Sequence, residues 1–316
     1  MGKQILLLET VHPILAEKLT ELGFKCEFNY KISYPELLEC ISQYHGIVLR
    51  SRISFDDQLI SAAKNLEFIA RSGSGLEIID LESCARHNIK VFSSPEGNSD
   101  AVGEHVIGML LSLSNNIHHA NTSVRRLEWL REEHRGFEIK GKTIALIGYG
   151  HMGKSVAKKL SGFECNVVAF DKYAAPESDL FVKSVSLNEV FETADVVSLH
   201  LPLSDETKEY ANANFFHSFK KKIVFINTSR GGHINASDLM SALDEGIISH
   251  AALDVLPFEK SSLEGLNENT LFERLLSYPN VLLTPHVAGW TTESYYKLSY
   301  VLYEKIKGHY ALKLFL

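Results

Sequence analysis

Charged side chains of three kinds follow separate apolar runs of this sequence. Arg230 comes after IVFIN, Glu259 lies in ALDVLPFE and His286 lies in LLTPHVAG. An arginine can hold a carboxylate in two parallel hydrogen bonds, and a histidine can give or take a proton near neutral pH. A glutamate on the other ring nitrogen would fix the tautomer of the histidine and favour its protonated form. These residue types predict proton transfer at the carbonyl oxygen of a bound 2-oxo acid.

The stretch GYGHMGKS, which begins at Gly148, matches two nucleotide-binding motifs. Gly148, Gly150 and Gly153 form the G-x-G-x-x-G of dinucleotide-binding loops. The first and last of these glycines, with Lys154 and Ser155, also form the G-x-x-x-x-G-K-S of nucleoside triphosphatases. Both motifs require a preceding strand and a following helix, so the local context does not choose between them.

Two residues favour the dinucleotide interpretation. Asp171 ends the next apolar run, about 20 positions after the first glycine, where a carboxylate binds a ribose hydroxyl. Because such a carboxylate repels a 2′-phosphate, the predicted cofactor is NAD rather than NADP. Gly150 would let the backbone approach a pyrophosphate closely. The triphosphatase interpretation stays open, since AALD at 251–254 resembles a strand and acid that hold magnesium.

An arginine, an acid and a histidine beside a nicotinamide are the groups that reversible hydride transfer to a 2-oxo acid requires. Asp254 follows an apolar run in the same way as the three residues above. If these runs are parallel strands, the residues meet at the sheet edge where open α/β sheets bind ligands. We therefore predict an NAD-dependent oxidoreductase with Arg230, Glu259 and His286 as its catalytic residues.

The elements that must position these residues alternate along nearly the whole chain. Short apolar runs and amphipathic stretches follow one another in two sets, which is typical of parallel sheets with helices on both faces. A long helical pattern, capped by Ser99 or Asp100, separates the sets, and another, capped by Thr291 or Thr292, follows the second. The chain is therefore expected to cross between two domains twice.

The predicted fold class is α/β, with two doubly wound parallel-sheet domains. Residues 1–98 and 290–316 would form a discontinuous, flavodoxin-like substrate domain. Residues 99–289 would form an inserted Rossmann domain that binds NAD.

Composition favours small ligands. The 316 residues are 45% hydrophobic and 22% charged, enough for two domains with cores. A formal net charge of -7 argues against sequence-independent binding to nucleic acid and against binding to an anionic membrane surface. The opening run is too short for a signal peptide and no segment is apolar enough for a membrane span, so we expect a cytoplasmic protein. The four cysteines lack the spacing of a zinc site, and no metal is expected.

The chain resembles the D-isomer-specific 2-hydroxyacid dehydrogenases, and within them the D-3-phosphoglycerate dehydrogenase branch. The motifs that carry the resemblance cover nearly the whole length in order: RSRIS, ARSGSGLEIID, PEGNSDAVGEHVIGMLLSL, LIGYGHMGK, INTSRGG, AALDVLPFE and LLTPHVAGWT. The resemblance implies the same catalytic trio, Arg230, Glu259 and His286, with NAD as cofactor.

The resemblance also implies roles for further residues. Ser72, Gly73 and Ser74 would offer donors to the substrate carboxylate, with Ser74 also reaching the cofactor. Asp171 would bind the adenosine ribose, and Asp254 would lie near the nicotinamide carboxamide. The remaining cofactor-binding residues would be His151 and Met152 over the pyrophosphate, Leu201 and Thr228 on the nicotinamide side, and Gly289 after the catalytic histidine.

More than one 2-oxo acid fits the sequence as a substrate. A phosphorylated acid such as 3-phosphoglycerate, the substrate of serine biosynthesis, needs cations, and Arg50, Arg52 and Arg71 are candidates. Arg50 is the one that we assign to the substrate. The alternatives are glyoxylate, hydroxypyruvate or another 2-oxo acid. Formate oxidation is disfavoured, because that branch of the family has a glutamine where this chain has Glu259.

Several features depart from the family pattern. Glu77 and Ile78 replace an aspartate and an asparagine, Lys260 replaces a proline, and His151 stands where many relatives have arginine. The segment 260–280 is long enough to hold a helix of its own. Because the sequence ends at Leu316, we expect no C-terminal regulatory domain.

Family resemblance further implies a homodimer formed through the inner domain. Residues 125–138 would be the arm that crosses to the partner, and Arg131 would reach the partner's active site. Two other classes of function stay open. One is a non-catalytic NAD(H)-sensing protein on the same fold, like the co-repressors that resemble this family, and the other is the triphosphatase.

Overall fold

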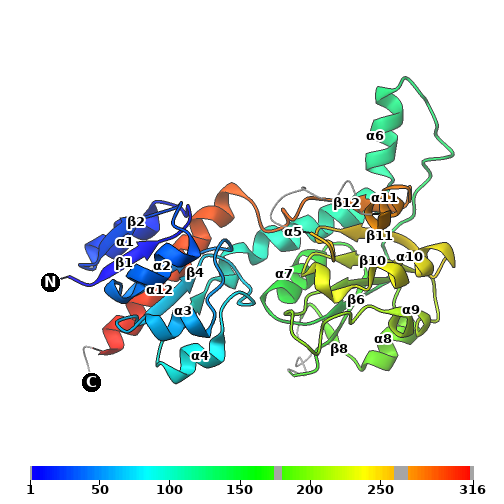
Figure 1. The fold of residues 1–316 in the computed structure, drawn as a ribbon. Coiled ribbons are helices and arrows are strands. Elements are labelled where there is room, and N and C mark those ends of the chain that lie inside the picture. The colour runs from blue at the N-terminus through cyan, green and yellow to red at the C-terminus, as the bar shows by residue number, and fades with distance from the viewer. Residues whose placement is uncertain (1, 174–179, 260–269, 314–316) are drawn as a thin grey trace. The chain divides into compact units, whose positions relative to one another are not determined.

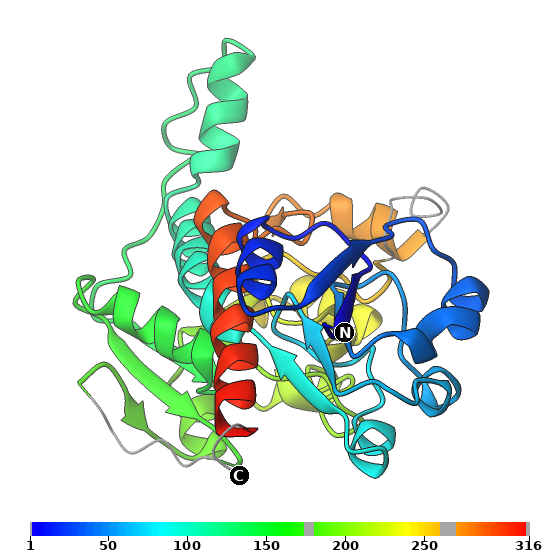
Figure 2. The same ribbon diagram turned by 90° about the vertical axis from the view of Figure 1, so that its left-hand side faces the viewer.

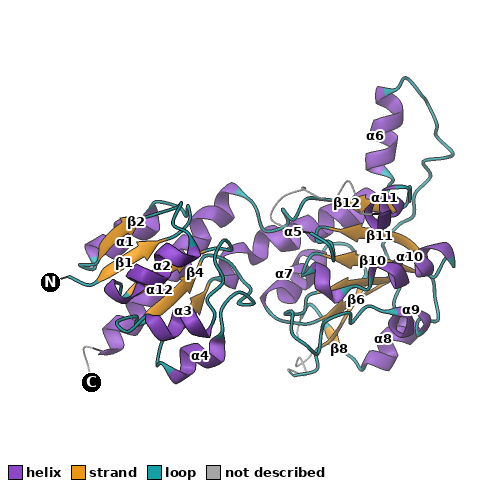
Figure 3. Ribbon diagram, viewed as in Figure 1, coloured by secondary structure: helices purple, strands orange, loops and turns teal. Residues whose placement is uncertain are grey.

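The computed structural model describes residues 2–173, 180–259 and 270–313. Its contacts divide the chain into two compact units, Met1–Ser99 with Trp290–Leu316, and Asp100–Gly289. Each unit is a parallel sheet with flanking helices (Figure 1, Figure 3), which confirms the predicted α/β class.

The first unit contains a five-stranded sheet in the order β2-β1-β3-β4-β5, the strand order of flavodoxin-like folds. Its strands pair in parallel and carry the short apolar runs of the sequence. The strands are β1 (Gln4–Leu7), β2 (Lys25–Phe28), β3 (Gly46–Leu49), β4 (Phe68–Arg71) and β5 (Lys90–Ser93), and the helices are α1 (Ile14–Glu21), α2 (Tyr34–Cys40), η1 (Ile41–Gln43), α3 (Asp57–Ala62), α4 (Leu81–Arg86) and α12 (Thr292–Lys313).

Helix α12 brings the C-terminal segment into the core of the first unit. Leu302 and Ile306 are fully buried and belong to one apolar cluster with Leu15 and Leu19 of α1. The helix begins with a side-chain cap, because the Oγ1 atom of Thr291 accepts a hydrogen bond of 3.0 Å from the backbone N–H of Ser294. This cap confirms the prediction for the start of α12.

The long helix between the two sets of strands begins earlier than predicted. Helix α5 runs over Pro95–Ser114, so Ser99 and Asp100 lie inside it and do not cap it. A proline fits the first turn of a helix, because its missing N–H would have no partner there. The boundary between the two units therefore falls within a continuous helix.

The second unit contains a seven-stranded parallel sheet in the order β12-β11-β10-β9-β6-β7-β8. The sequence order reverses between β6 and β9, as in Rossmann folds. The strands are β6 (Thr143–Ile147), β7 (Asn166–Phe170), β8 (Lys183–Ser184), β9 (Val196–Leu199), β10 (Ile223–Asn227), β11 (Ile248–Leu253) and β12 (Val281–Leu283), and the helices are α6 (Ile117–Arg125), α7 (His151–Leu160), α8 (Leu187–Thr193), α9 (Ala213–His217), η2 (Gly231–His233), α10 (Ala236–Asp244) and α11 (Thr270–Leu276).

Both faces of this sheet are buried, and helices cover them. Val106 of α5 and Val156 of α7 belong to the cluster on one face. Phe216 of α9 and Leu239 of α10 belong to the cluster on the other. Burial on both faces explains why the strands are almost continuously apolar.

Two segments singled out in the sequence lie at the margin of the second unit. Helix α6 and the chain that follows it extend away from the sheet (Figure 1, Figure 2), with the Leu127 and Trp129 side chains 96% and 79% exposed. Helix α11 supplies the helix expected in the segment 260–280, whose residues 260–269 lie outside the described part of the chain. No helix in the described ranges is both long and apolar enough to cross a membrane.

Candidate active site

The register of the second sheet aligns the residues that directly follow six neighbouring strands. Ile147 pairs with Phe170 on one side and with Leu199 on the other, and the alignment continues through Asn227 to β11 and β12. The next residue of each strand therefore stands in one row along the carboxyl edge, where open α/β sheets bind ligands. In spatial order these residues are Asp171, Gly148, His200, Thr228, Asp254 and Thr284.

The glycine loop between β6 and α7 depends on its glycines. Gly148 has a φ of +94°, and a Cβ atom there would lie 2.6 Å from the carbonyl oxygen of His200. A Cβ atom at Gly153 would lie 2.4 Å from the carbonyl oxygen of Gly148. Because both glycines lack a Cβ atom, the N-terminus of α7 can lie close against the strand end, as a phosphate-binding turn requires.

Gly150 differs from its two neighbours in the motif. A Cβ atom there would meet no atom of the described chain within 4 Å, and its φ of -80° suits any residue. The fold itself does not require this glycine, which fits the predicted close approach of a pyrophosphate to the backbone. The loop therefore fits a dinucleotide on structural grounds as well as by motif.

Replacing Gly150 by alanine tests this interpretation. We expect NADH affinity to fall about tenfold, roughly 1.4 kcal/mol, while the melting temperature stays unchanged, because the added methyl group meets the cofactor and not the protein. Gly162→Ala is the matched control, since a Cβ atom there also meets nothing within 4 Å. Equal NADH titrations for both variants would contradict the assignment of the loop.

Two residues that a triphosphatase would need are buried: the Oγ atom of Ser155, which has no hydrogen-bond partner among the described residues, and the carboxylate of Asp254. The Oγ atom of Ser155 lies against α5, only 2.5 Å from where a Cβ atom of Gly103 would be. The Asp254 carboxylate is bound by backbone groups, as described below. Neither is available for a magnesium nucleotide, so the structure favours the dinucleotide.

Asp171 lies beside the glycine loop, one strand away from Gly148. Its Oδ2 atom accepts a hydrogen bond of 2.9 Å from the backbone N–H of Tyr149, and its Oδ1 atom accepts one of 3.0 Å from Tyr173. The carboxylate is thereby fixed next to the turn. This is the position that the ribose-binding acid of a dinucleotide site occupies.

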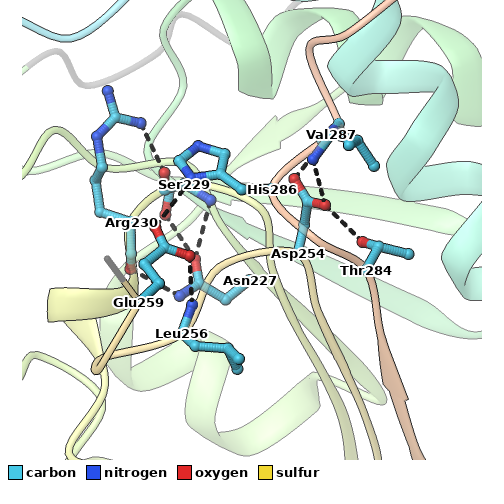
Figure 4. Close-up of polar contacts among 10 residues, drawn as sticks. Asn227, Ser229, Arg230, Asp254, Leu256, Glu259, Thr284, His286 and Val287 are labelled. Atoms are coloured by element: carbon cyan, nitrogen blue, oxygen red, sulfur yellow. Dashed lines mark hydrogen bonds and ion pairs between the residues drawn. The ribbon is translucent and has the colours of Figure 1, made fainter. Parts of the chain in front are cut away.

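His286 and Glu259 form the hydrogen-bonded pair that the sequence predicts. The Nδ1 atom of His286 lies 2.9 Å from Oε1 of Glu259 (Figure 4). Glu259 is itself held, because its Oε2 atom accepts a hydrogen bond of 3.0 Å from the backbone N–H of Leu256. Half of the His286 side chain is exposed, and its Nε2 atom has no partner among the described residues. The free nitrogen is thus the one that can exchange a proton with a ligand.

The surroundings of His286 raise its pKa. The hydrogen bond to Glu259 is the largest cause, and the negative charge of Asp254 acts in the same direction. Burial and the positive charge of Arg230 oppose this effect. The net result extends the range of pH over which the imidazole carries the proton that a carbonyl oxygen would take.

Glu259→Gln should move the pH dependence of the reaction. The pKa of His286 should fall without the carboxylate. The reduction of a 2-oxo acid that the sequence predicts, which needs the protonated ring, should then decline from a lower pH than in the wild type. Oxidation of the hydroxy acid, which needs the neutral ring, should extend to lower pH. Profiles of kcat/KM in both directions check this, and identical profiles would remove Glu259 from its assigned role.

Arg230 follows β10 in a turn that buried polar groups hold. The Oδ1 atom of Asn227 accepts hydrogen bonds from the backbone N–H and the Oγ atom of Ser229, at 3.0 and 2.7 Å. The amide nitrogen of Asn227 donates to the carbonyl oxygen of Arg230 at 2.9 Å. Nη1 of Arg230 donates to the carbonyl oxygen of Ser229 at 2.7 Å (Figure 4). The turn therefore positions the guanidinium group near His286, whose pKa it influences.

Asp254 is buried, and it organises the loop that carries His286. Its Oδ1 atom accepts a hydrogen bond of 2.9 Å from the backbone N–H of Val287, and Oδ2 accepts one of 2.8 Å from Ala288. Its backbone carbonyl oxygen accepts the N–H of His286 at 2.8 Å. His286 has a φ of +55°, which costs a non-glycine residue on the order of 1 kcal/mol or more. The contacts with Asp254 stabilise this conformation.

His200 and Thr228 are two buried residues in the row of strand-end residues, and the sequence gives little indication of their surroundings. Burial lowers the pKa of His200 to about 4, so its ring is neutral at physiological pH. Neither of its ring nitrogens, nor Oγ1 of Thr228, has a hydrogen-bond partner in the described part of the chain. Sequence analysis placed Thr228 beside the nicotinamide and did not assign His200, because a lone histidine at a strand end has no distinctive spacing.

His105 is a further residue that sequence analysis did not assign. It lies on α5, and its Nε2 atom is 3.1 Å from Oγ1 of Thr284 and 3.6 Å from Oδ1 of Asp254. Only its adjacency to a glutamate within a helical pattern is visible in the sequence. Such a pattern does not reveal which side chain the helix presents to a loop 179 residues away.

Within the first unit, the predicted substrate loop follows β4. Ser72 donates its backbone N–H to Leu49, the carbonyl oxygen of Gly73 accepts from the backbone N–H of Ser94, and Oγ of Ser74 donates to Asn98 at 2.7 Å. These bonds fix the loop within its own unit.

The three arginines proposed for a phosphate differ in their surroundings. Arg52 donates to the backbone carbonyl oxygens of Ile32 and Leu8, and Nε of Arg71 donates to that of Arg50. These two guanidinium groups therefore stabilise the fold, because they satisfy carbonyl groups in loops and directly after strands. The guanidinium group of Arg50 instead lies 4.3 Å from the ring centroid of Trp290 and makes no hydrogen bond within the described ranges. Arg50 alone keeps its donors for a ligand.

The remaining predicted residues lie around the same edge of the second unit. His151 and Met152 form the first turn of α7. The side chain of Leu201 lies next to Gly148, where a Cβ atom would be 3.3 Å from its Cδ2 atom. Gly289 is the last residue of the second unit.

Comparisons with known proteins agree with this geometry. The family model described as D-isomer specific 2-hydroxyacid dehydrogenase, NAD binding domain, matches residues 107–288. The chain is 31% identical to D-3-phosphoglycerate dehydrogenase of Archaeoglobus fulgidus over 305 residues, which cover 96% of this chain and 56% of the relative. It is 34% identical to hydroxypyruvate reductase of Thermotoga maritima over 271 residues, which cover 86% of each.

A solved structure shows the same fold over the whole chain. An acyclic imino acid reductase in complex with NADPH and D-Arg is 26% identical, with a TM-score of 0.86, and the similarity covers 98% of each chain. The chain spans about half the length of the curated phosphoglycerate dehydrogenases that it matches.

Proposed function

Because the chain belongs to the family of D-isomer specific 2-hydroxyacid dehydrogenases, we propose that it interconverts a D-2-hydroxy acid and the corresponding 2-oxo acid with NAD. The observation that carries the proposal is the pair of His286 and Glu259, 2.9 Å apart, on the sheet edge that also holds the glycine loop. A proton donor with a raised pKa beside a dinucleotide site is what carbonyl reduction requires.

The mechanism follows from the residues. When bound, NADH would supply a hydride to the carbonyl carbon and would thereby be oxidised to NAD. Arg230 binds the carboxylate of the 2-oxo acid and draws electron density from the neighbouring carbonyl group. His286 gives its Nε2 proton to the carbonyl oxygen as the hydride arrives, and Glu259 stabilises the imidazolium before that step. In the oxidation direction, neutral His286 takes the hydroxyl proton.

Two further groups have roles predicted from the sequence. Asp171 binds the adenosine ribose, and its charge makes NAD the preferred cofactor. The loop Ser72–Ser74 offers donors to the substrate carboxylate. These roles stand on the motifs, and single alanine substitutions with separate measurement of the KM for NADH and for the 2-oxo acid would test them.

The substrate that we propose first is the pair 3-phosphoglycerate and 3-phosphohydroxypyruvate, which belongs to serine biosynthesis. The names of several relatives support it, and Arg50 is available for a phosphate. Hydroxypyruvate or glyoxylate is the alternative. The relative from Thermotoga maritima, which matches over 86% of its length, is named for hydroxypyruvate, and Arg52 and Arg71 are engaged by the backbone.

Initial rates of NADH oxidation against a panel of 2-oxo acids distinguish these substrates. The panel should include 3-phosphohydroxypyruvate, hydroxypyruvate, glyoxylate and pyruvate, with NADPH in parallel. We expect the highest kcat/KM with 3-phosphohydroxypyruvate and NADH, and a loss of that preference in Arg50→Gln. Turnover of unphosphorylated acids alone would keep the mechanism and discard the phosphorylated substrate. NADH binding without any turnover would favour a sensor of NAD(H).

We also propose a homodimer. The exposed Leu127 and Trp129 lie in the segment predicted to cross to a partner, and apolar side chains at that exposure are typical of an interface. Light scattering after size exclusion would detect a particle of twice 35.4 kDa. A cytoplasmic location also stays a prediction, which fractionation of the source cells would test.

A further inference from the structure

Asp254 accepts hydrogen bonds from four groups of the loop that carries His286. Asp254 accepts hydrogen bonds from the backbone N–H groups of His286, Val287 and Ala288. Its Oδ1 atom also accepts a bond of 2.5 Å from Oγ1 of Thr284, the first residue of the loop. Since His286 has a left-handed backbone conformation, the setting of its ring depends on how firmly Asp254 is fixed.

Asp254 is in turn connected to helix α5. Its side chain is 1% exposed, so the carboxylate depends on protein donors rather than on water. Besides the backbone groups of the loop, the side chains that approach it are Thr284 and His105, the latter at 3.6 Å between Nε2 and Oδ1. Among the described residues, His105 is therefore the only side chain outside the His286 loop that approaches this carboxylate.

The number of protons that each group can donate determines the direction of the hydrogen bonds from His105 to Asp254. A threonine hydroxyl has one proton to donate, and Thr284 gives it to the Asp254 carboxylate. In the contact of 3.1 Å with His105, the hydroxyl oxygen of Thr284 must therefore be the acceptor. It follows that Nε2 of His105 carries the proton that is donated. The sequence of bonds runs from Nε2–H of His105 through Thr284 to Oδ1 of Asp254. In such a chain each bond polarises and strengthens the next.

We propose that His105 is a positioning residue of the active site, which acts through Thr284 and Asp254 to hold the His286 loop in its working conformation. In the described part of the chain its ring contacts Thr284 and Asp254, and it makes no hydrogen bond to Arg230, Glu259 or His286. Without its donor, the Thr284 hydroxyl can rotate away and the buried carboxylate loses part of its support. The loop then gains freedom, and the distance between His286 and Glu259 is no longer kept at 2.9 Å.

The expected effect of His105 on kcat rests on the proposed dehydrogenase function. The expected effect of His105 on the ionisation of His286 does not. A loosened loop should lower kcat about tenfold or more, since displacement of a catalytic group by less than 1 Å has effects of that order. The KM for NADH should change by no more than about twofold, because Thr284, which His105 contacts, ends the row on the side away from the glycine loop.

The ionisation of His286 gives a readout that needs no cofactor. The charged groups that face its ring are Glu259, Asp254 and Arg230, and the bond to Glu259 is the largest influence on its pKa. If the loop loosens, that bond weakens, and the pKa of His286 should fall by at least a few tenths of a unit. Histidine ring nitrogens can be followed by NMR in ¹⁵N-labelled protein, with the His286→Asn spectrum identifying the resonance among the 14 histidines.

The experiment compares two pairs of variants. His105→Phe keeps a ring but loses the donor, and His105→Gln keeps an N–H donor at a similar reach. Thr284→Val keeps the shape but loses the hydroxyl, and Thr284→Ser keeps it. We expect the first member of each pair to show the lower kcat and the lower pKa of His286, and the second member to recover most of both.

The outcomes separate this inference from the proposed function. A Phe variant with wild-type kcat and wild-type His286 titration would overturn the inference, and so would a Gln variant no better than Phe. If His105→Phe is too unstable to measure, His105→Asn, whose amide is too short to reach Thr284, replaces it, and the Thr284 pair tests the next bond of the chain. If the wild type turns over no 2-oxo acid, the proposed function fails, and the NMR titrations still decide whether His105 positions the loop.

Discussion

Replacement of His286 by asparagine should lower kcat for 2-oxo acid reduction by about 10²- to 10⁴-fold, the usual contribution of a general acid or base. Asparagine is the informative substitution because it tolerates the left-handed backbone that His286 adopts, with a φ of +55°. The loop should therefore keep its hydrogen bonds to Asp254, and only the exchangeable proton is lost.

Binding of NADH is the control for this variant. His286 contacts Glu259 and the Asp254 backbone and lies away from the glycine loop, so the dissociation constant measured by NADH fluorescence should stay close to that of the wild type. A kcat within about twofold of the wild type would remove His286 from the mechanism. Loss of NADH binding together with turnover would instead indicate a damaged fold.

Arg230→Gln has the second largest expected effect. A bidentate clamp on a carboxylate consists of two charge-assisted hydrogen bonds, each worth about 1.5–3 kcal/mol. Their loss should reduce kcat/KM for the 2-oxo acid on the order of 10²- to 10⁴-fold. NADH affinity should be nearly unchanged. The rate should also lose its preference for a carboxylate next to the carbonyl group, which a matched series of 2-oxo acids and their amides would measure.

Arg230→Lys separates charge from geometry. Lysine keeps the positive charge but not the planar fork, so its kcat/KM should lie between those of the wild type and of the glutamine variant. Free guanidinium ion should partly restore the activity of Arg230→Gln. A lysine variant as active as the wild type would contradict the bidentate clamp, and a glutamine variant with unchanged KM and kcat would contradict any contact with the substrate.

The edge of the second sheet was predictable from sequence because its signals are local. Each strand is a short apolar run, and parallel strands place the residues after them on one edge. Arg230, Glu259 and His286 could therefore be grouped from the sequence. The structure joins Glu259 and His286 by a hydrogen bond, and the catalytic roles of the three residues stay a prediction. The glycine loop was predictable for the same reason, since its spacing reflects backbone geometry within eight residues.

Contacts between distant segments were not predictable. The roles of Arg52 and Arg71 depend on carbonyl groups at the ends of other strands, which no pattern in RSRIS or ARSGS reveals. The hydrogen bonds that Asp254 accepts from the loop after β12 arise only when the two strands lie side by side. The role of His105 could not be predicted, because helical periodicity indicates which face of a helix is buried but not which distant residue a side chain contacts.

Two sequence signals compete for the start of helix α5. Ser99 and Asp100 are good caps, yet the helix begins at Pro95, where a proline at the first position needs no hydrogen bond. The early start makes α5 continuous across the boundary between the units, and it places His105 well inside the helix.

Transfer of deuterium from [4-²H]NADH to a 2-oxo acid tests the central claim most directly. The wild-type protein is incubated with hydroxypyruvate or 3-phosphohydroxypyruvate and with NADH labelled on one or the other face, and the hydroxy acid is examined by mass spectrometry. The account predicts one deuterium at C2 of a D-hydroxy acid, from one labelled face only, and far less product with His286→Asn. Binding of NADH with no deuterium in the acid under any of these conditions would contradict it.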